Sequence, residues 1–188
     1  MPDTSPQFIF ATMLPESFRT TNHLLRPLSM TDAKEIFLSY AQDPEVSLYT
    51  IWMPHKILSD TEEFVSDCLS VPPHISRTYS IYDNKEGGFR GLFSLRQIKS
   101  FYVEFGYVLA RPWWGRGIMT EVLKKSVILM LSQKECFRIS GICDVENLGS
   151  ARVMEKAGLK REGILRRCII HPNVSKLPRD CFSYAAVK

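Results

Sequence analysis

A Gly-x-Gly step at residues 115–117 is the first segment of the chain that could do chemistry. It lies between an apolar run that ends near Ala110 and a run with helical spacing that begins at Ile118. Glycine allows a tight turn and leaves the backbone open to a ligand, because it has no Cβ. The first N–H groups of a helix have no partner within the helix and lie at its positive end. The segment therefore predicts a main-chain anion site suited to a pyrophosphate, although a glycine-rich helix start without a ligand explains the same residues.

The spacing around this step excludes two common phosphate motifs. A Rossmann fingerprint needs a third glycine, but position 120 is Thr, and no Gly-Lys-Ser/Thr follows as in a Walker loop. A second segment lies some thirty residues further on. Asn147 is typical of a helix N-cap, Ser150 falls in the first turn with a free hydroxyl, and Gly158 is a natural helix stop. Nothing local in that second segment requires a cofactor.

The elements that must position these residues follow from hydrophobic periodicity and turn residues. We expect strands over residues 24–28, 78–82, 92–95, 101–109, 137–143, 159–170 and 181–187. We expect helices over residues 29–43, 59–71, 115–132 and 147–158, with residues 45–58 unassigned. This order predicts one mixed α/β sheet with helices on its faces.

Composition limits the class of protein. The chain has 188 residues, 45% apolar and 23% charged, which fits a single globular domain. No run of eighteen uncharged apolar residues occurs, so we expect no membrane span. The N-terminus does not read as a secretory signal. Five cysteines without a Cys-x-x-Cys pair argue against a disulfide framework, and four scattered histidines argue against a metal site. A cytoplasmic protein with reduced thiols is the simplest interpretation.

Charge is distributed unevenly along the chain. Residues 95–188 carry 17 basic and 8 acidic side chains, whereas residues 1–94 carry 7 basic and 12 acidic ones. A basic second half favours an anionic partner, for which nucleic acid and a phosphorylated cofactor both qualify. A merely solvated surface accounts for the same charges.

Taken together, the two segments resemble a known family. The pattern Pro-x-Trp-Gly-x-Gly-x-Met-Thr-Glu at residues 112–121, followed by Asn-x-x-Ser-x-Arg-Val-x-Glu-Lys-x-Gly-Leu at residues 147–159, resembles the GNAT superfamily of N-acetyltransferases. Within that superfamily the chain looks like the branch that contains the Rim-type ribosomal-protein N-terminal acetyltransferases. The resemblance covers residues 22–187, including Leu-Arg-Pro at 25–27, Glu-Phe-Gly-Tyr at 104–107 and Glu-Gly at 162–163.

The resemblance implies a fold and a cosubstrate. The fold is α/β (mixed α+β): one domain over residues 1–188, with an N-terminal extension at 1–20 and a motif core at about 100–165. Its twisted mixed sheet has six to seven strands, helices on both faces, and fourth and fifth strands that splay apart. Acetyl-CoA lies in that opening, and no metal is needed. The implied cofactor-binding residues are Val108, Leu109, Ala110, Trp114, Gly115, Arg116, Gly117, Ile118, Met119, Thr120, Asn147 and Ser150. Three arginines, Arg111, Arg116 and Arg152, are candidates to help hold the phosphates.

The implied reaction moves the acetyl group to a primary amine by direct attack in a ternary complex. Glu104 is the candidate base, since it lies four residues before Val108 and so on the same face of the strand. An ordinary Glu has a pKa of about 4.3, so this role needs desolvation or a water relay. Many family members have a Tyr acid seven residues after the motif asparagine, but here that position is Met154. Ser150 is therefore the candidate to steer the leaving thiol or a water.

Three functions remain open from sequence. The first is acetylation of a protein N-terminal amine, with a ribosomal protein as a possible partner. The second is acetylation of an aminoglycoside or polyamine, which an acidic pocket built from Asp43, Glu45, Glu62 or Glu63 would favour. The third is a catalytically silent module that binds CoA or RNA. Residues 45–58 are expected to shape the acceptor site, and either a monomer or a homodimer fits.

Overall fold

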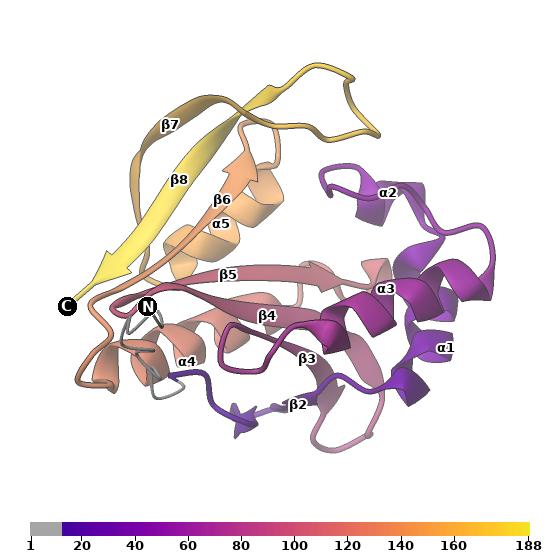
Figure 1. Cartoon of the computed structure of the whole chain (residues 1–188), viewed down its shortest axis with the longest axis horizontal. Coiled ribbons are helices and arrows are strands. Elements are labelled where there is room, and N and C mark those ends of the chain that lie inside the picture. The colour runs from indigo at the N-terminus through magenta and orange to yellow at the C-terminus, as the bar shows by residue number, and fades with distance from the viewer. Residues whose placement is uncertain (1–12) are drawn as a thin grey trace, which may run out of the picture.

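The computed structural model describes residues 13–188, so the first twelve residues of the expected N-terminal extension lie outside the described part. An eight-stranded mixed sheet forms the centre (Figure 1). Its strands are Phe18–Arg19 (β1), His23–Pro27 (β2), Ser76–Asp83 (β3), Phe89–Lys99 (β4), Tyr102–Leu109 (β5), Arg138–Asp144 (β6), Lys160–Ile169 (β7) and Arg179–Val187 (β8). Their spatial order is β1-β2-β3-β4-β5-β6-β8-β7. The prediction of six to seven strands therefore omitted one, and the two-residue β1 is too short to show a periodicity.

The pair β5 and β6 is parallel, and it is joined over a short stretch. Residues Tyr102–Glu104 pair with Arg138–Ser140, and beyond that point the two strands diverge (Figure 1). Strand β5 continues along β4, whereas β6 continues along β8. We call the region where β5 and β6 no longer pair the β5–β6 fork. The predicted splay of the fourth and fifth strands is confirmed.

Residues 13–188 form five α-helices: Ala33–Ile36 (α1), Pro44–Ser47 (α2), Leu58–Ser70 (α3), Ile118–Ser132 (α4) and Leu148–Lys156 (α5). Helices α4 and α5 pack with one face of the sheet in the larger core, and α1 and α3 pack on the other face in a second core. Alternation along β5 follows this division. Phe105, Tyr107 and Leu109 pack against the first core, and Val108 and Ala110 against the second.

The helix expected over residues 29–43 is interrupted. It consists of a 3₁₀ turn at Met30–Asp32, α1, and a π-helical segment at Phe37–Ala41. The unassigned segment contains the short α2, which Asp43 caps through its carboxylate, followed by an irregular loop. Residues 13–20 are part of the body, because Met13, Leu14 and Phe18 are buried in the larger core. None of the helices formed by residues 13–188 is long and apolar enough to cross a bilayer.

Candidate active site

The Gly-x-Gly step forms the turn that starts α4. Gly115 and Gly117 have φ values of 73° and 79°, in the left-handed region where a side chain is strained. A Cβ at either glycine would meet nothing within 4 Å, so open space lies beside both. The side chains of Ile118 and Met119 are buried in the core, which leaves the outer side of the turn to main chain. No side chain caps the helix at Gly117, so the expected bare helix start is present.

The main-chain N–H and C=O groups of successive residues near the end of β5 point alternately toward β4 and toward the β5–β6 fork. The Ala110 N–H donates to the Arg90 carbonyl at 3.0 Å, so Ala110, and Val108 two residues before it, direct their main-chain groups toward β4. Tyr107 and Leu109 direct theirs to the other side, into the β5–β6 fork. The carbonyl of Leu109 accepts a hydrogen bond from Trp114 Nε1 at 2.8 Å. This bond fixes Trp114 across the end of β5, a role that sequence reasoning did not assign.

Helix α5 supplies the opposite wall of the fork. Asn147 caps it as expected, and its Oδ1 accepts from the Ser150 N–H at 3.0 Å. The Ser150 Oγ lies 2.7 Å from the Tyr107 hydroxyl, a contact between α5 and β5. Burial raises the pKa of Tyr107 far above its usual value, so this phenol stays protonated at neutral pH. Tyr107 was missed from sequence, because its partner lies 43 residues further along the chain.

Two further positions, 154 and 104, were considered for proton transfer, and one is buried in the core while the other lies beside the β5–β6 fork. Met154, at the position where many family members have a tyrosine acid, is fully buried in the larger core and serves as a packing residue. Glu104 lies at the last pair before the fork. Its carboxylate accepts from Arg96 Nη2 and from the Tyr102 hydroxyl, both at 2.8 Å. The Tyr102 hydroxyl also lies 2.7 Å from Ser140 Oγ on β6. Two hydroxyls therefore connect Glu104 to β6 at the last residue pair before β5 and β6 diverge.

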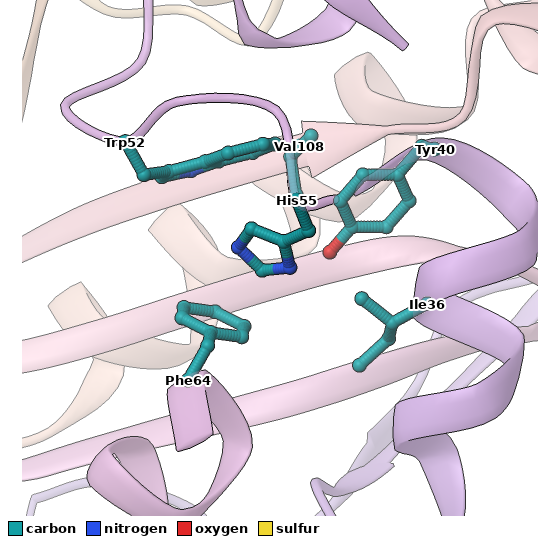
Figure 2. A pocket seen from close by; sticks show the side chains of 6 residues that line it. All are labelled: Ile36, Tyr40, Trp52, His55, Phe64 and Val108. Carbon is teal, nitrogen blue, oxygen red and sulfur yellow. The ribbon is translucent and has the colours of Figure 1, made fainter. Parts of the chain in front are cut away.

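A small cavity lies on the other face of β5. It is lined by Ile36, Tyr40, Trp52, His55, Phe64 and Val108, and we call it the aromatic pocket (Figure 2). Trp52 and His55 come from the segment that sequence could not assign. Val108 belongs to the strand that borders the fork, so the pocket lies beside the expected acetyl site.

The loop between β7 and β8 fastens this unassigned segment in place. Asn173 Nδ2 donates to the carbonyls of Ser47 and Trp52 at 2.7 and 2.8 Å. His171 Nδ1 lies 3.2 Å from the Thr50 carbonyl. Figure 1 shows this loop reaching α2 across the wide end of the fork. The loop between β7 and β8 therefore holds the 47–52 segment through side chains from near the other end of the sequence.

Of the three arginines that were candidates to hold the phosphates, two already contact other side chains. Arg111 is ion-paired with Asp43 at 2.9 Å, and the Arg116 guanidinium lies over the Trp113 ring. Arg152 is exposed on α5. Burial raises the pKa of Cys143, the thiol near Ser150, to about 11, which makes it a poor nucleophile at neutral pH. Within residues 13–188 no group of His, Cys, Asp or Glu side chains could hold a metal ion.

Comparison with known proteins agrees with this geometry. A family model described as the acetyltransferase (GNAT) domain matches residues 22–160. The probable N-acetyltransferase YjcK of Bacillus subtilis is 28% identical over 156 residues, which cover 76% of this chain and 83% of YjcK. Two solved structures share the fold. They are the microcin C7 self-immunity acetyltransferase MccE in complex with acetyl-CoA and AMP, and the ribosomal-protein acetyltransferase RimL in complex with coenzyme A.

The structural match extends over nearly the whole chain. MccE superposes with a TM-score of 0.81 at 20% identity and covers 94% of this chain and 99% of its own. RimL superposes with a TM-score of 0.78 at 18% identity and covers 93% of this chain and 97% of its own. The family model spans well over half of the residues, from β2 to the start of β7. The chain therefore belongs to the GNAT acetyltransferase family.

Proposed function

We propose that this acetyltransferase moves the acetyl group of acetyl-CoA to a primary amine by direct attack in a ternary complex. The observation that carries the proposal is that the chain runs from β5, where it borders the β5–β6 fork, through the turn at residues 115–117 to a helix start that no side chain caps. A pyrophosphate on the N–H groups of residues 115–120 directs the pantetheine arm along the edge of β5. That edge offers the main-chain groups of Tyr107 and the N–H of Leu109, whose carbonyl is engaged by Trp114. MccE and RimL, whose structures were solved with acetyl-CoA and CoA, share the fold.

The proposed roles of the polar residues follow from their contacts. A main-chain N–H of β5 polarises the thioester carbonyl. Glu104, with Arg96 and Tyr102 fixing its carboxylate, receives through a water the proton that the amine nitrogen loses after attack. Ser150 donates to the departing thiolate, and the protonated Tyr107 holds its hydroxyl in place. Because the buried thiols are poor nucleophiles, we favour direct transfer over an acyl-enzyme.

The acceptor that we propose is an uncharged or singly charged amine, such as a protein N-terminus. RimL is a ribosomal-protein acetyltransferase of the same fold. The polyamine alternative called for an acidic pocket, but no carboxylate lines the aromatic pocket. Asp43 is tied to Arg111, and Glu45, Glu62 and Glu63 are exposed. The lining of the aromatic pocket therefore offers a multiply charged acceptor no carboxylate.

The test is release of free thiol from acetyl-CoA with a panel of peptides, aminoglycosides and polyamines, alongside calorimetric titration with CoA. Turnover with peptide amines supports the proposal. Tight CoA binding without turnover on any amine indicates a silent CoA-binding module instead. Failure to bind CoA at all contradicts the placement of the pyrophosphate at residues 115–120.

A further inference from the structure

The aromatic pocket has features that simple packing does not explain. The Tyr40 hydroxyl is buried and has no hydrogen-bond partner among residues 13–188. An unsatisfied buried hydroxyl costs free energy, and buried polar groups normally have a hydrogen-bond partner. Figure 2 shows this hydroxyl directed toward the space beside His55. The hydroxyl therefore indicates a missing polar partner inside the pocket.

His55 lies between two aromatic rings. The ring centroids of Trp52 and Phe64 are 5.3 and 6.1 Å from that of His55. One imidazole nitrogen is already committed, because Nδ1 lies 2.7 Å from the Oγ1 of the fully buried Thr61. With its proton on Nδ1 and donated to Thr61, the ring presents an unprotonated Nε2. The backbone of His55 is fixed as well, since its N–H donates to the Ala41 carbonyl at 2.8 Å.

The electrostatics keep this imidazole neutral. Burial lowers the pKa of His55 below its ordinary value, and the Asp60 carboxylate only partly opposes that effect. Asp60 is itself held by the N–H groups of Lys56 and Ile57, at the start of α3. Of the groups facing the ring from the other elements, Tyr40 and Thr61 are uncharged hydroxyls at neutral pH. A neutral imidazole can accept a proton.

The size and lining of the pocket suit one chemical group. Its volume of about 20 Å³ is enough for a single water-sized group. Trp52, Tyr40 and Phe64 bring three aromatic rings to the lining, and aromatic rings attract a cation that lies over their faces. We propose that the aromatic pocket is the amine subsite of the transferase: it admits the –NH₃⁺ head of a primary amine, and His55 Nε2 takes its proton before attack. This inference rests on the proposed function.

The proton balance of the reaction is complete. The ammonium gives one proton to His55 Nε2, and the free amine nitrogen forms a bond to the thioester carbon. The nitrogen then loses a second proton, by way of water, to Glu104. The C–S bond breaks, and the thiolate takes a proton that water supplies through the Ser150 hydroxyl, so that Ser150 gives one proton and receives another in the same step. His55 and Glu104 each return a proton to solvent, so the products are the amide, the thiol and one net proton.

A binding experiment tests the pocket without turnover. Protein labelled with ¹³C at histidine Cε1 is titrated with methylammonium chloride at constant ionic strength, and the His55 resonance is assigned from the His55→Gln spectrum. We expect methylammonium to shift this resonance and to lower the pKa of His55, because a cation beside the ring disfavours its protonation. Trimethylammonium is too large to enter and leaves it unchanged. His74, an exposed histidine, is the internal control. If methylammonium moves the His55 signal no more than that of His74, the proposal is wrong.

Kinetic variants test the same pocket during turnover. Tyr40→Phe keeps the ring and removes the hydroxyl, so we expect a KM for the primary amine about 10-fold higher with the KM for acetyl-CoA unchanged. His55→Gln should lower kcat by about 10²-fold and change the acid limb of the pH profile, whereas His74→Gln should do neither. A His55→Gln enzyme with the wild-type rate and profile overturns the proposal. Should the wild type bind CoA but acetylate nothing, the proposed function fails, and the methylammonium titration still decides the pocket.

Discussion

The Tyr107 hydroxyl on β5 lies 2.7 Å from the Ser150 Oγ on α5, across the fork where β5 and β6 separate. It joins β5, the strand along which we propose that the thioester lies, to the helix that carries the second motif. Tyr107 is half-buried against the larger core, and the burial of its hydroxyl raises its pKa, so its proton stays on the oxygen. A protonated Tyr107 can donate to Ser150 Oγ, which leaves the Ser150 hydroxyl proton free for another acceptor.

Removing the Tyr107 hydroxyl should slow the chemical step without loosening the cofactor. For Tyr107→Phe we expect kcat to fall by about 10-fold to 10²-fold, because Ser150 loses the partner that orients it. The dissociation constant of CoA, measured by calorimetry, should not change. Tyr82→Phe, a hydroxyl deletion in the β2–β3 region, is the matched control. Equal kcat values for Tyr107→Phe and the wild type would exclude this role.

Gly117→Val should weaken CoA binding. Its φ of 79° costs about 1–2 kcal/mol for a residue with a Cβ, and more for a β-branched one. The added methyl groups also enter the open space beside the turn. We expect an affinity at least about 10-fold lower in the CoA titration. Gly163→Ala, which fills open space on β7 at an unstrained φ, should bind CoA normally. Unchanged affinity in Gly117→Val contradicts the phosphate placement.

Glu104→Gln should lower kcat by about 10²-fold while CoA affinity stays nearly the same. The amide keeps the size of the side chain but cannot take a proton. Steady-state rates as a function of pH check this, because the carboxylate must be ionised to act. Arg96→Gln tests positioning: it removes the ion pair to Glu104 and should slow turnover less. A pH–rate profile of Glu104→Gln that matches the wild type removes Glu104 from the mechanism.

Asn173→Ala should affect the acceptor and not the cofactor. The side chain donates to the carbonyls of Ser47 and Trp52, and both of these hydrogen bonds are lost in the variant, although Thr50 still donates to each carbonyl. We expect the docked loop to lose about 2 kcal/mol of stability, seen as faster amide exchange over residues 47–55. The KM for the amine should rise while the KM for acetyl-CoA stays constant. Equal exchange rates in both proteins would show that the loop is held by other contacts.

Asp144 should make stability depend on acid pH. Burial opposes its ionisation, but hydrogen bonds from Arg179 at 2.6 and 3.0 Å outweigh burial and leave the pKa lowered. A carboxyl with a lowered folded pKa contributes stability above its unfolded pKa of about 3.9 and loses it as pH falls through the folded value. Asp144→Asn should cost about 3–5 kcal/mol at pH 7 by urea unfolding. The gap between the two proteins should narrow toward pH 3, and a constant gap would contradict this account.

The local geometry of both motifs could be predicted from sequence. A positive φ at Gly115 and Gly117, and the cap that Asn147 gives α5, involve residues within four positions of each other. The spans of the later strands and helices followed from periodicity, which reports which face of an element is buried. The splay of β5 and β6 came from resemblance to a family, not from any pattern in the residues themselves.

Only the tertiary structure decided which side chains meet. Tyr107 contacts Ser150 because the fold brings β5 beside α5. Asn173 contacts Trp52, 121 residues earlier in the sequence, because the loop between β7 and β8 packs against the 47–52 segment. Tyr40, Trp52, His55 and Phe64 enclose one pocket although the segment that supplies two of them has no periodicity. Contacts of this kind depend on the path of the chain between elements. That path is set by how side chains from the whole chain pack together in the core, and a short stretch of sequence does not report those contacts.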